Sequence, residues 1–372
     1  MRRSSAAFRA DGRATIGTVA TALGGQAFLV LSGVLAARLL GVEDRGRFAL
    51  LAIFPLVLAQ LGGMGVPLAV TFRVASGRDS ARAAVTAVRP LIAAQLALVL
   101  VVHVAILLLV AFPGAPHRME TAGLITLAWT PAALLQGYAE ALLQGQARFR
   151  AFNLLRLAPI VFSALLVGIA ALLGFGTLVG IASVWTLGYI LSASASLVIA
   201  SRGAVGDASD GVTSRTGLLQ FGLRGLLGSS SPLETFRLDQ AVVGLVISQT
   251  ALGIYVVAIA FTNLPRFVAQ SVGMVAYPRV AAQTDVQAAT RALWVFALVG
   301  TVACAAIAGA LELVVGFTVP LFFGHAFVRA VEPCRILLIA SFFFGMRRVL
   351  SDGARGIGRP GLGTVAELGT WI

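Results

Sequence analysis

The chain alternates long apolar runs with short polar segments from one end to the other. A run of about 20 apolar residues is long enough to cross the hydrocarbon core of a bilayer as an α-helix. The pattern predicts about ten complete membrane spans and the start of an eleventh near Gly361. The ten spans are expected at residues 15–40, 47–72, 90–112, 121–145, 153–174, 178–200, 218–247, 253–278, 289–318 and 332–354. The predicted fold class is therefore all-α, a polytopic membrane protein.

Composition agrees with this pattern and argues against several other classes of protein. Hydrophobic residues make up 58% of the 372 residues and charged residues only 12%, whereas soluble domains carry about 25% charged residues. The net charge of +13 comes from arginines spread over short loops, without the basic patch typical of nucleic-acid binding. Cys304 and Cys334 belong to separate apolar segments, and no metal-ligand spacing occurs. We expect no nucleic-acid partner, no disulfide and no metal site.

The arginines also predict how the chain is inserted. All 28 basic residues are arginine. With the N-terminus in the cytoplasm, 19 arginines fall on the cytoplasmic side, 5 on the outer side and 4 within helices. Cytoplasmic loops of membrane proteins carry an excess of basic residues. The alternation therefore supports a cytoplasmic N-terminus and the number of spans.

A weak internal repeat suggests two similar halves. Segments align at an offset of about 207 residues, so that the ends of spans one, two and four match the ends of spans seven, eight and ten. We expect an N-terminal lobe at residues 1–205, with spans 1–6, and a C-terminal lobe at 206–372, with spans 7–10 and part of span 11. The second lobe is expected to be truncated in span eleven, lacking roughly 40 residues. Parallel repeats of this kind place a site between the lobes, near the membrane midplane.

The eighth predicted span carries a polar stripe. Arg266 lies at its midpoint, where a charge costs at least about 2.5–3.5 kcal/mol, so the guanidinium must face protein or a watery cavity. Residues three and four apart share one face of a helix. The residues of this stripe are Thr262, Asn263, Arg266, Gln270 and Gly273. One polar face on an otherwise apolar helix indicates the hydrophilic cavity of a transporter.

Several longer segments together resemble a known family. They are ARLLGVEDRGRFALL, LGGMGVPLAVTFRVA, LLQGQARFRAFNLLRL, FRLDQAVVGLVISQTALGIYVVA, VAYPRVA and LFFGHAFVRAVEPCRILLIA. These segments are similar to the polysaccharide-export (O-antigen type, lipid-linked oligosaccharide) flippases of the multidrug/oligosaccharidyl-lipid/polysaccharide flippase superfamily. The resemblance covers nearly the whole chain. It implies that an undecaprenyl-diphosphate-linked oligosaccharide is moved from the inner to the outer leaflet by alternating access, in the bacterial cytoplasmic membrane.

Arg266 is the first candidate for contact with such a substrate. A diphosphate-linked headgroup is anionic, and a guanidinium offers phosphate two parallel hydrogen bonds. The alternative is a structural ion pair with Glu234 on the neighbouring span. Both interpretations hold if Glu234 pairs with Arg266 only while substrate is absent.

The other charged candidates also have two interpretations each. Glu234 and Arg237 are three residues apart and are expected to pair along one helix face as part of the cavity lining or as a structural clasp. Asp239 or Glu234 would otherwise be a carboxylate that couples transport to H⁺ or Na⁺. His103, in span three, is either a proton relay or a neutral imidazole bonded to a neighbouring helix.

Uncharged candidates complete the expected cavity lining. Asn263 and Gln270 belong to the polar stripe of span eight, and Gln26 and Gln60 lie in spans one and two. Such amides line a cavity or join helices to one another. A hydrogen bond between membrane helices typically contributes about 0.6 kcal/mol to stability.

Two related transport functions and two unrelated classes remain as alternatives. A multidrug or toxin cation antiporter would need an acidic, aromatic cavity, whereas a peptidoglycan-precursor flippase would share the cationic one. No nucleophile–base set or phosphate-binding glycine loop occurs, so we expect no catalytic residue, no enzyme activity and no cofactor. A membrane scaffold that transports nothing is the remaining class. The expected partners are the lipid-linked oligosaccharide and the bilayer, with a polysaccharide polymerase and glycosyltransferases as further candidates.

Overall fold

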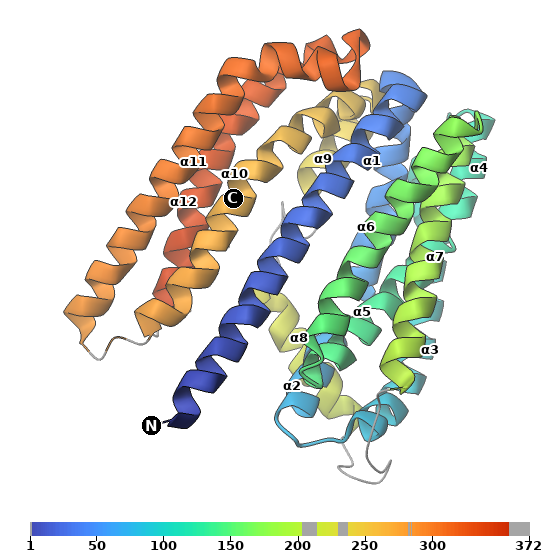
Figure 1. The fold of residues 1–372 in the computed structure, drawn as a ribbon. Helices are drawn as coiled ribbons and strands as arrows, with labels where there is room; N and C mark the ends of the chain where they lie inside the picture. The colour runs from blue at the N-terminus through green and yellow to red at the C-terminus, as the bar shows by residue number, and fades with distance from the viewer. Residues whose placement is uncertain (1, 203–213, 230–236, 282, 284, 357–372) are drawn as a thin grey trace. The chain divides into compact units, whose positions relative to one another are not determined.

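The computed structural model describes residues 2–202, 214–229, 237–281, 283 and 285–356. Every regular element in these ranges is a helix (Figure 1). Among the described residues, five helices are long and apolar enough to cross a membrane, and a sixth is added if the bent pair Ala27–Gly62 and Val66–Ala75 counts as one span. The all-α membrane fold class is confirmed. The start of span eleven and the truncation lie outside the described residues.

The chain forms two compact units. Unit 1 contains most of α1 and all of α2 to α8, and unit 2 contains the segment Gly41–Gly46 and α9 to α12. The division into lobes at residue 205 and the six-span repeat stay predictions.

Unit 1 is built from the first eight α-helices and one π-helical turn. Their bounds are α1 Arg2–Gly62, α2 Val66–Ala75, α3 Ala81–Ile106, η1 Leu107–Ala111, α4 His117–Thr126, α5 Trp129–Gly145, α6 Phe149–Leu172, α7 Leu178–Arg202 and α8 Arg215–Ser229.

Unit 2 continues with shorter and longer helices in turn. Their bounds are α9 Leu238–Val242, η2 Val243–Ile247, α10 Gln249–Ala281, α11 Val286–Phe323, η3 His325–Ala330 and α12 Val331–Gly356. Within the described residues, helix occurs in each of the ten segments where the hydropathy pattern predicted a span.

Glycines interrupt the first two spans. Gly41 (φ 70°) separates span one from span two inside α1, and a second break at Met64 and Gly65 (φ 48° and 67°) separates α1 from α2. The two sides of this second break are bent by 51°. Positive φ is accessible to glycine without steric cost. Gln95 on α3 stabilises the break, because its Nε2 donates to the Gly63 carbonyl at 3.3 Å while its Oε1 accepts from the Tyr138 hydroxyl at 2.6 Å.

Span seven differs from the prediction. We expected one helix over 218–247, but Arg237, directly before α9, has a non-helical φ of 49°. The prediction that Arg237 lies within a membrane-depth helix was therefore wrong. Glu234, its expected partner, lies outside the described residues.

Each unit has its own polar and apolar packing. In unit 1, Arg73 at the end of α2 makes two hydrogen bonds to the buried Asp79 carboxylate, at 2.6 and 2.8 Å. In unit 2, α10, α11 and α12 pack together, and Gly345 makes room for Cys304, whose thiol donates to the Pro265 carbonyl at 3.5 Å.

Candidate functional site

Unit 2 contains a cluster of two arginines and one aromatic ring, which we call the arginine cluster. The Arg266 guanidinium carbon lies 5.1 Å from the centroid of the Phe344 ring, and that of Arg347 lies 5.5 Å from the same centroid. Phe344 and Arg347 are three residues apart on α12, so their side chains share a face. A ring attracts a cation placed over its face, which stabilises both guanidinium groups beside it.

Arg266 retains hydrogen-bonding capacity in this cluster. The side chain is half-buried on α10, and its buried Nε has no hydrogen-bond partner among the described residues. A guanidinium carries five N–H donors in a planar fork. Arg266 is therefore held by an aromatic contact, and the described residues do not use all of its donors.

A carboxylate lies in the same unit and is only partly satisfied. The Tyr255 hydroxyl donates to Asp239 Oδ2 at 2.9 Å, whereas the buried Asp239 Oδ1 has no partner in the described part of the chain. Asp239 and Tyr255 therefore form a polar pair in unit 2 whose hydrogen-bonding capacity is only partly used.

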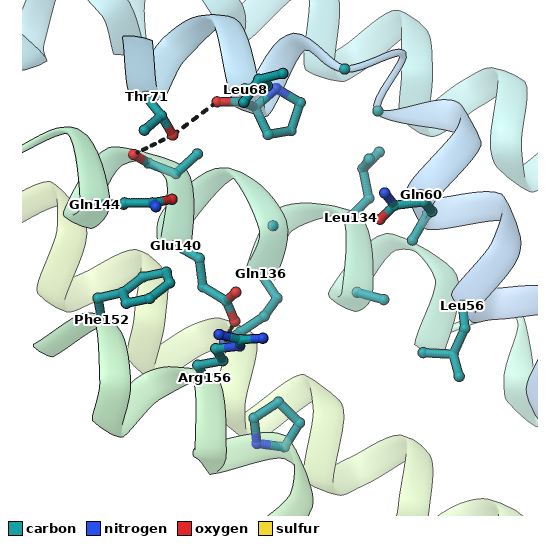
Figure 2. A pocket seen from close by; sticks show the side chains of 18 of the residues that line it. Leu56, Gln60, Leu68, Thr71, Leu134, Gln136, Glu140, Gln144, Phe152 and Arg156 are labelled. Atoms are coloured by element: carbon teal, nitrogen blue, oxygen red, sulfur yellow. Dashed lines mark hydrogen bonds between the residues drawn. The ribbon is translucent and has the colours of Figure 1, made fainter. Parts of the chain in front are cut away.

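Unit 1 contains a polar cavity of about 610 Å³, which we call the amide cavity (Figure 2). Its wall is made by the end of α1 and by α2, α5, α6, α7 and α8. Apolar side chains cover part of the wall, among them Leu56, Leu134 and Ile160. The polar side chains at the wall are Gln60, Thr71, Gln136, Glu140, Gln144, Arg156 and Tyr189.

Gln136 organises one side of the amide cavity. Its Nε2 donates to Glu140 Oε1 and to the Leu155 carbonyl, both at 2.9 Å, and its Oε1 accepts from the Ser192 hydroxyl at 3.3 Å. The Leu155 carbonyl needs this donor because Pro159, four residues later in α6, has no N–H to offer it. The amide of Gln136 thus joins α5, α6 and α7.

A second side of the wall is fixed through α2. The Thr71 hydroxyl is within bonding distance of the Ala141 carbonyl at 3.0 Å and of the Pro67 carbonyl at 3.2 Å (Figure 2). Tyr189 is held by its ring, whose centroid lies 4.6 Å from that of Trp129. These contacts restrict the motion of the wall.

Other groups at the cavity are not used by the described part of the fold. Gln60 and Gln144 are exposed, and neither amide bonds to another described residue. Figure 2 shows the Arg156 guanidinium close to the Glu140 carboxyl, and its positive charge acts on that carboxyl. The cavity therefore presents available amides together with one positive and one negative charge.

The residues that the sequence singled out belong to different units. Gln60 lines the amide cavity, whereas Asn263, Arg266 and Asp239 belong to unit 2. His103 does not line that cavity. It is buried, and its Nδ1 lies 2.7 Å from the Thr130 hydroxyl.

Three predicted residues and two predicted ion pairs lie beyond what the structure describes. The side chains of Gln26 and Gln270 are outside the described part of the molecule, although the backbones belong to α1 and α10. Arg237 is exposed, and its expected pairing with Glu234, like that of Arg266, involves a residue outside the described ranges. The substrate-binding and coupling roles of all these residues stay predictions.

Sequence reasoning missed most of the amide cavity and half of the arginine cluster. Gln136, Glu140 and Gln144 recur every four residues along an apolar helix, the same signal that identified the polar stripe around Arg266. That signal was available. Arg347 was assigned to membrane topology, and its contact with Phe344 beside Arg266 depends on tertiary packing.

Comparison with known proteins identifies the family. Residues 15–283 match the family described as "Polysaccharide biosynthesis protein". Among curated proteins, none is detectably similar to this chain.

Solved structures share the fold at low sequence identity. A lipid II flippase MurJ in an inward closed conformation has a TM-score of 0.74 and 14% identity, over 95% of this chain and 78% of that one. An inward-facing multidrug resistance MATE family transporter of the MOP superfamily has a TM-score of 0.67 and 18% identity, over 92% and 83%. A MATE structure in complex with MaD3S has a TM-score of 0.63 and 16% identity, over 96% and 84%. The chain belongs to the polysaccharide biosynthesis protein family and has the fold of these membrane transporters and flippases.

Proposed function

We propose that the protein is a flippase that moves an undecaprenyl-diphosphate-linked oligosaccharide from the inner to the outer leaflet by alternating access. The product would serve cell-surface polysaccharide biosynthesis, and the protein would lie in the bacterial cytoplasmic membrane with its N-terminus in the cytoplasm. Family membership supports a role in polysaccharide biosynthesis. The observation that carries the proposal is the arginine cluster of unit 2.

The physical basis is the cost of moving an anionic headgroup through an apolar layer. An isolated charge at membrane depth is unfavourable by at least several kcal/mol, so a diphosphate needs fixed positive charge along its route. Arg266 and Arg347 supply two guanidinium groups at one ring, and Arg266 has a buried N–H without a partner among the described residues. Guanidinium groups bind phosphate oxygens in a bidentate way.

The same cluster argues against a multidrug antiporter that takes cationic substrates, because two guanidinium groups repel a cation. A peptidoglycan-precursor flippase remains the second candidate, since its diphosphate would meet the same cluster. Asp239, hydrogen-bonded by Tyr255 and with one oxygen unpartnered in the described ranges, is the proposed carboxylate for coupling to H⁺ or Na⁺. We propose no enzyme activity and no cofactor.

The test is transport in vesicles that contain the purified full chain. We expect radiolabelled undecaprenyl-diphosphate-linked oligosaccharide to cross the bilayer, and Arg266→Gln to slow the crossing by about 10- to 100-fold, the loss of one or two charge-assisted hydrogen bonds. Arg329→Gln is the matched control, because Arg329 is exposed in η3 of the same unit.

Two outcomes would contradict the proposal. Transport by Arg266→Gln at the rate of the unmodified protein would remove the arginine cluster from the mechanism. Crossing of lipid II but not of the polysaccharide precursor would favour the second candidate.

A further inference from the structure

We propose that the amide cavity of unit 1 is a saccharide subsite, which binds uncharged sugar rings of the transported molecule. This inference rests on the proposed function and adds the residues that recognise the sugar. It concerns neither Arg266 nor any other residue of the arginine cluster.

The charge of the cavity favours a neutral ligand. Glu140 and Arg156 contribute opposite charges that lie close together, so the described wall has no net charge (Figure 2). The arginine cluster contributes two positive charges around Phe344. A diphosphate is therefore expected to be attracted to the cluster, whereas the amide cavity has no net charge to attract it.

The available polar groups match the chemistry of sugar hydroxyls. A hydroxyl donates one hydrogen bond and accepts others, and a glutamine amide likewise offers both donors and an acceptor. Gln60 and Gln144 carry such amides without any partner among the described residues, and Tyr189 also lines the cavity. The apolar faces of Leu56 and Leu134 are suited to the C–H faces of sugar rings.

The size and rigidity of the cavity fit a ligand site. Its volume of about 610 Å³ falls within the range of about 300–1,000 Å³ typical of small-molecule sites. Thr71 and Gln136 are fixed by hydrogen bonds that together join α2, α5, α6 and α7. Part of the wall is therefore already ordered before a ligand binds. A preorganised wall reduces the entropy lost on binding.

The experiment compares two ligands that differ only in the sugar. The full chain, in lipid nanodiscs, is titrated with undecaprenyl diphosphate and with undecaprenyl-diphosphate-linked oligosaccharide isolated from the cells in which the protein occurs. We expect the oligosaccharide form to bind more tightly. The double variant Gln60→Leu/Gln144→Leu should weaken its binding by about tenfold or more, from two lost hydrogen bonds, and change the Kd of undecaprenyl diphosphate by less than about twofold.

Two further variants control for folding and for general surface effects. Tyr189→Phe keeps the ring beside Trp129 and removes only the hydroxyl. It should weaken binding of the oligosaccharide-linked form by about threefold. Gln220→Leu removes an exposed amide from α8 of the same unit, away from the cavity wall, and should leave both Kd values unchanged.

The outcomes separate this inference from the proposed function. If the unmodified protein binds neither ligand, the proposed function fails, and the subsite fails with it. If both ligands bind with the same Kd, or if the double variant weakens both equally, the flippase proposal stands and the saccharide subsite is wrong.

Discussion

The hydrogen-bonded amide of Gln136 in unit 1 and the arginine cluster of unit 2 use polar groups in different ways. In unit 1, the central amide of Gln136 makes three hydrogen bonds within the protein, and Arg73 is paired with a buried carboxylate. In unit 2, Arg266 and Asp239 each keep a buried polar atom without a partner in the described part of the chain. A saturated buried polar group stabilises a fold, whereas a buried group without a partner costs stability. Gln136 and Arg73 are thus expected to respond to mutation differently from Arg266.

The largest difference should appear when an arginine is removed from each unit. Arg73→Met leaves the buried Asp79 carboxylate without its bidentate partner. We expect the free energy of unfolding to fall by about 3 kcal/mol. Arg266→Met removes a charge whose Nε has no described hydrogen-bond partner and loses only a ring contact, so the change should stay within about 1 kcal/mol. Denaturant unfolding of both variants in detergent measures this. Equal losses of unfolding free energy in the two variants would contradict this difference between Arg73 and Arg266.

The second prediction concerns the amide that joins three helices. Gln136→Leu leaves the Glu140 carboxyl, the Leu155 carbonyl and the Ser192 hydroxyl without a shared partner, and should lower the free energy of unfolding by about 2–3 kcal/mol. Gln144→Leu, two turns later on the same helix, removes an amide with no partner among the described residues. It should change the free energy of unfolding by less than about 0.5 kcal/mol. A similar melting temperature for the two variants would show that Gln136 is not structural.

The third prediction tests whether the aromatic ring holds the arginine cluster in place. Phe344→Leu keeps an apolar side chain but removes the ring face beside both guanidinium groups. We expect the affinity for undecaprenyl diphosphate to fall by about three- to tenfold, the equivalent of one cation–π contact. Phe343→Leu, on the adjacent and more exposed residue of α12, is the matched control. A loss of affinity that is the same in both variants would point to general damage to α12.

The smallest expected effect is that of salt. Raising NaCl from about 0.05 to 0.5 M should weaken binding of undecaprenyl diphosphate by about two- to fivefold, because partly buried charges are only partly screened. The ratio of its Kd to that of the oligosaccharide-linked form should stay constant, since the described wall of the amide cavity has no net charge. A ratio that falls with salt would mean that the sugar is recognised through charge.

Much of the fold could be predicted from hydropathy because each span is a long apolar run. The prediction of 178–200 compares with Leu178–Arg202 in the structure, and that of 332–354 with Val331–Gly356. The non-helical backbone of Arg237 was missed, because hydropathy averaged over a window does not register the conformation of one residue. Arg266 was found because one charge in an apolar helix stands out. The position of Arg347 beside the same ring depends on tertiary packing, which the sequence pattern does not show.

The proline in α6 has a consequence for how this sequence can change. Pro159 deprives the Leu155 carbonyl of its usual helical donor, and Gln136, on another helix, supplies a donor from the side. A carbonyl oxygen has two lone pairs, so a chain with alanine at position 159 would regain the backbone donor without displacing Gln136. Loss of Gln136 is therefore expected to cost more stability when Pro159 is present than when alanine stands there.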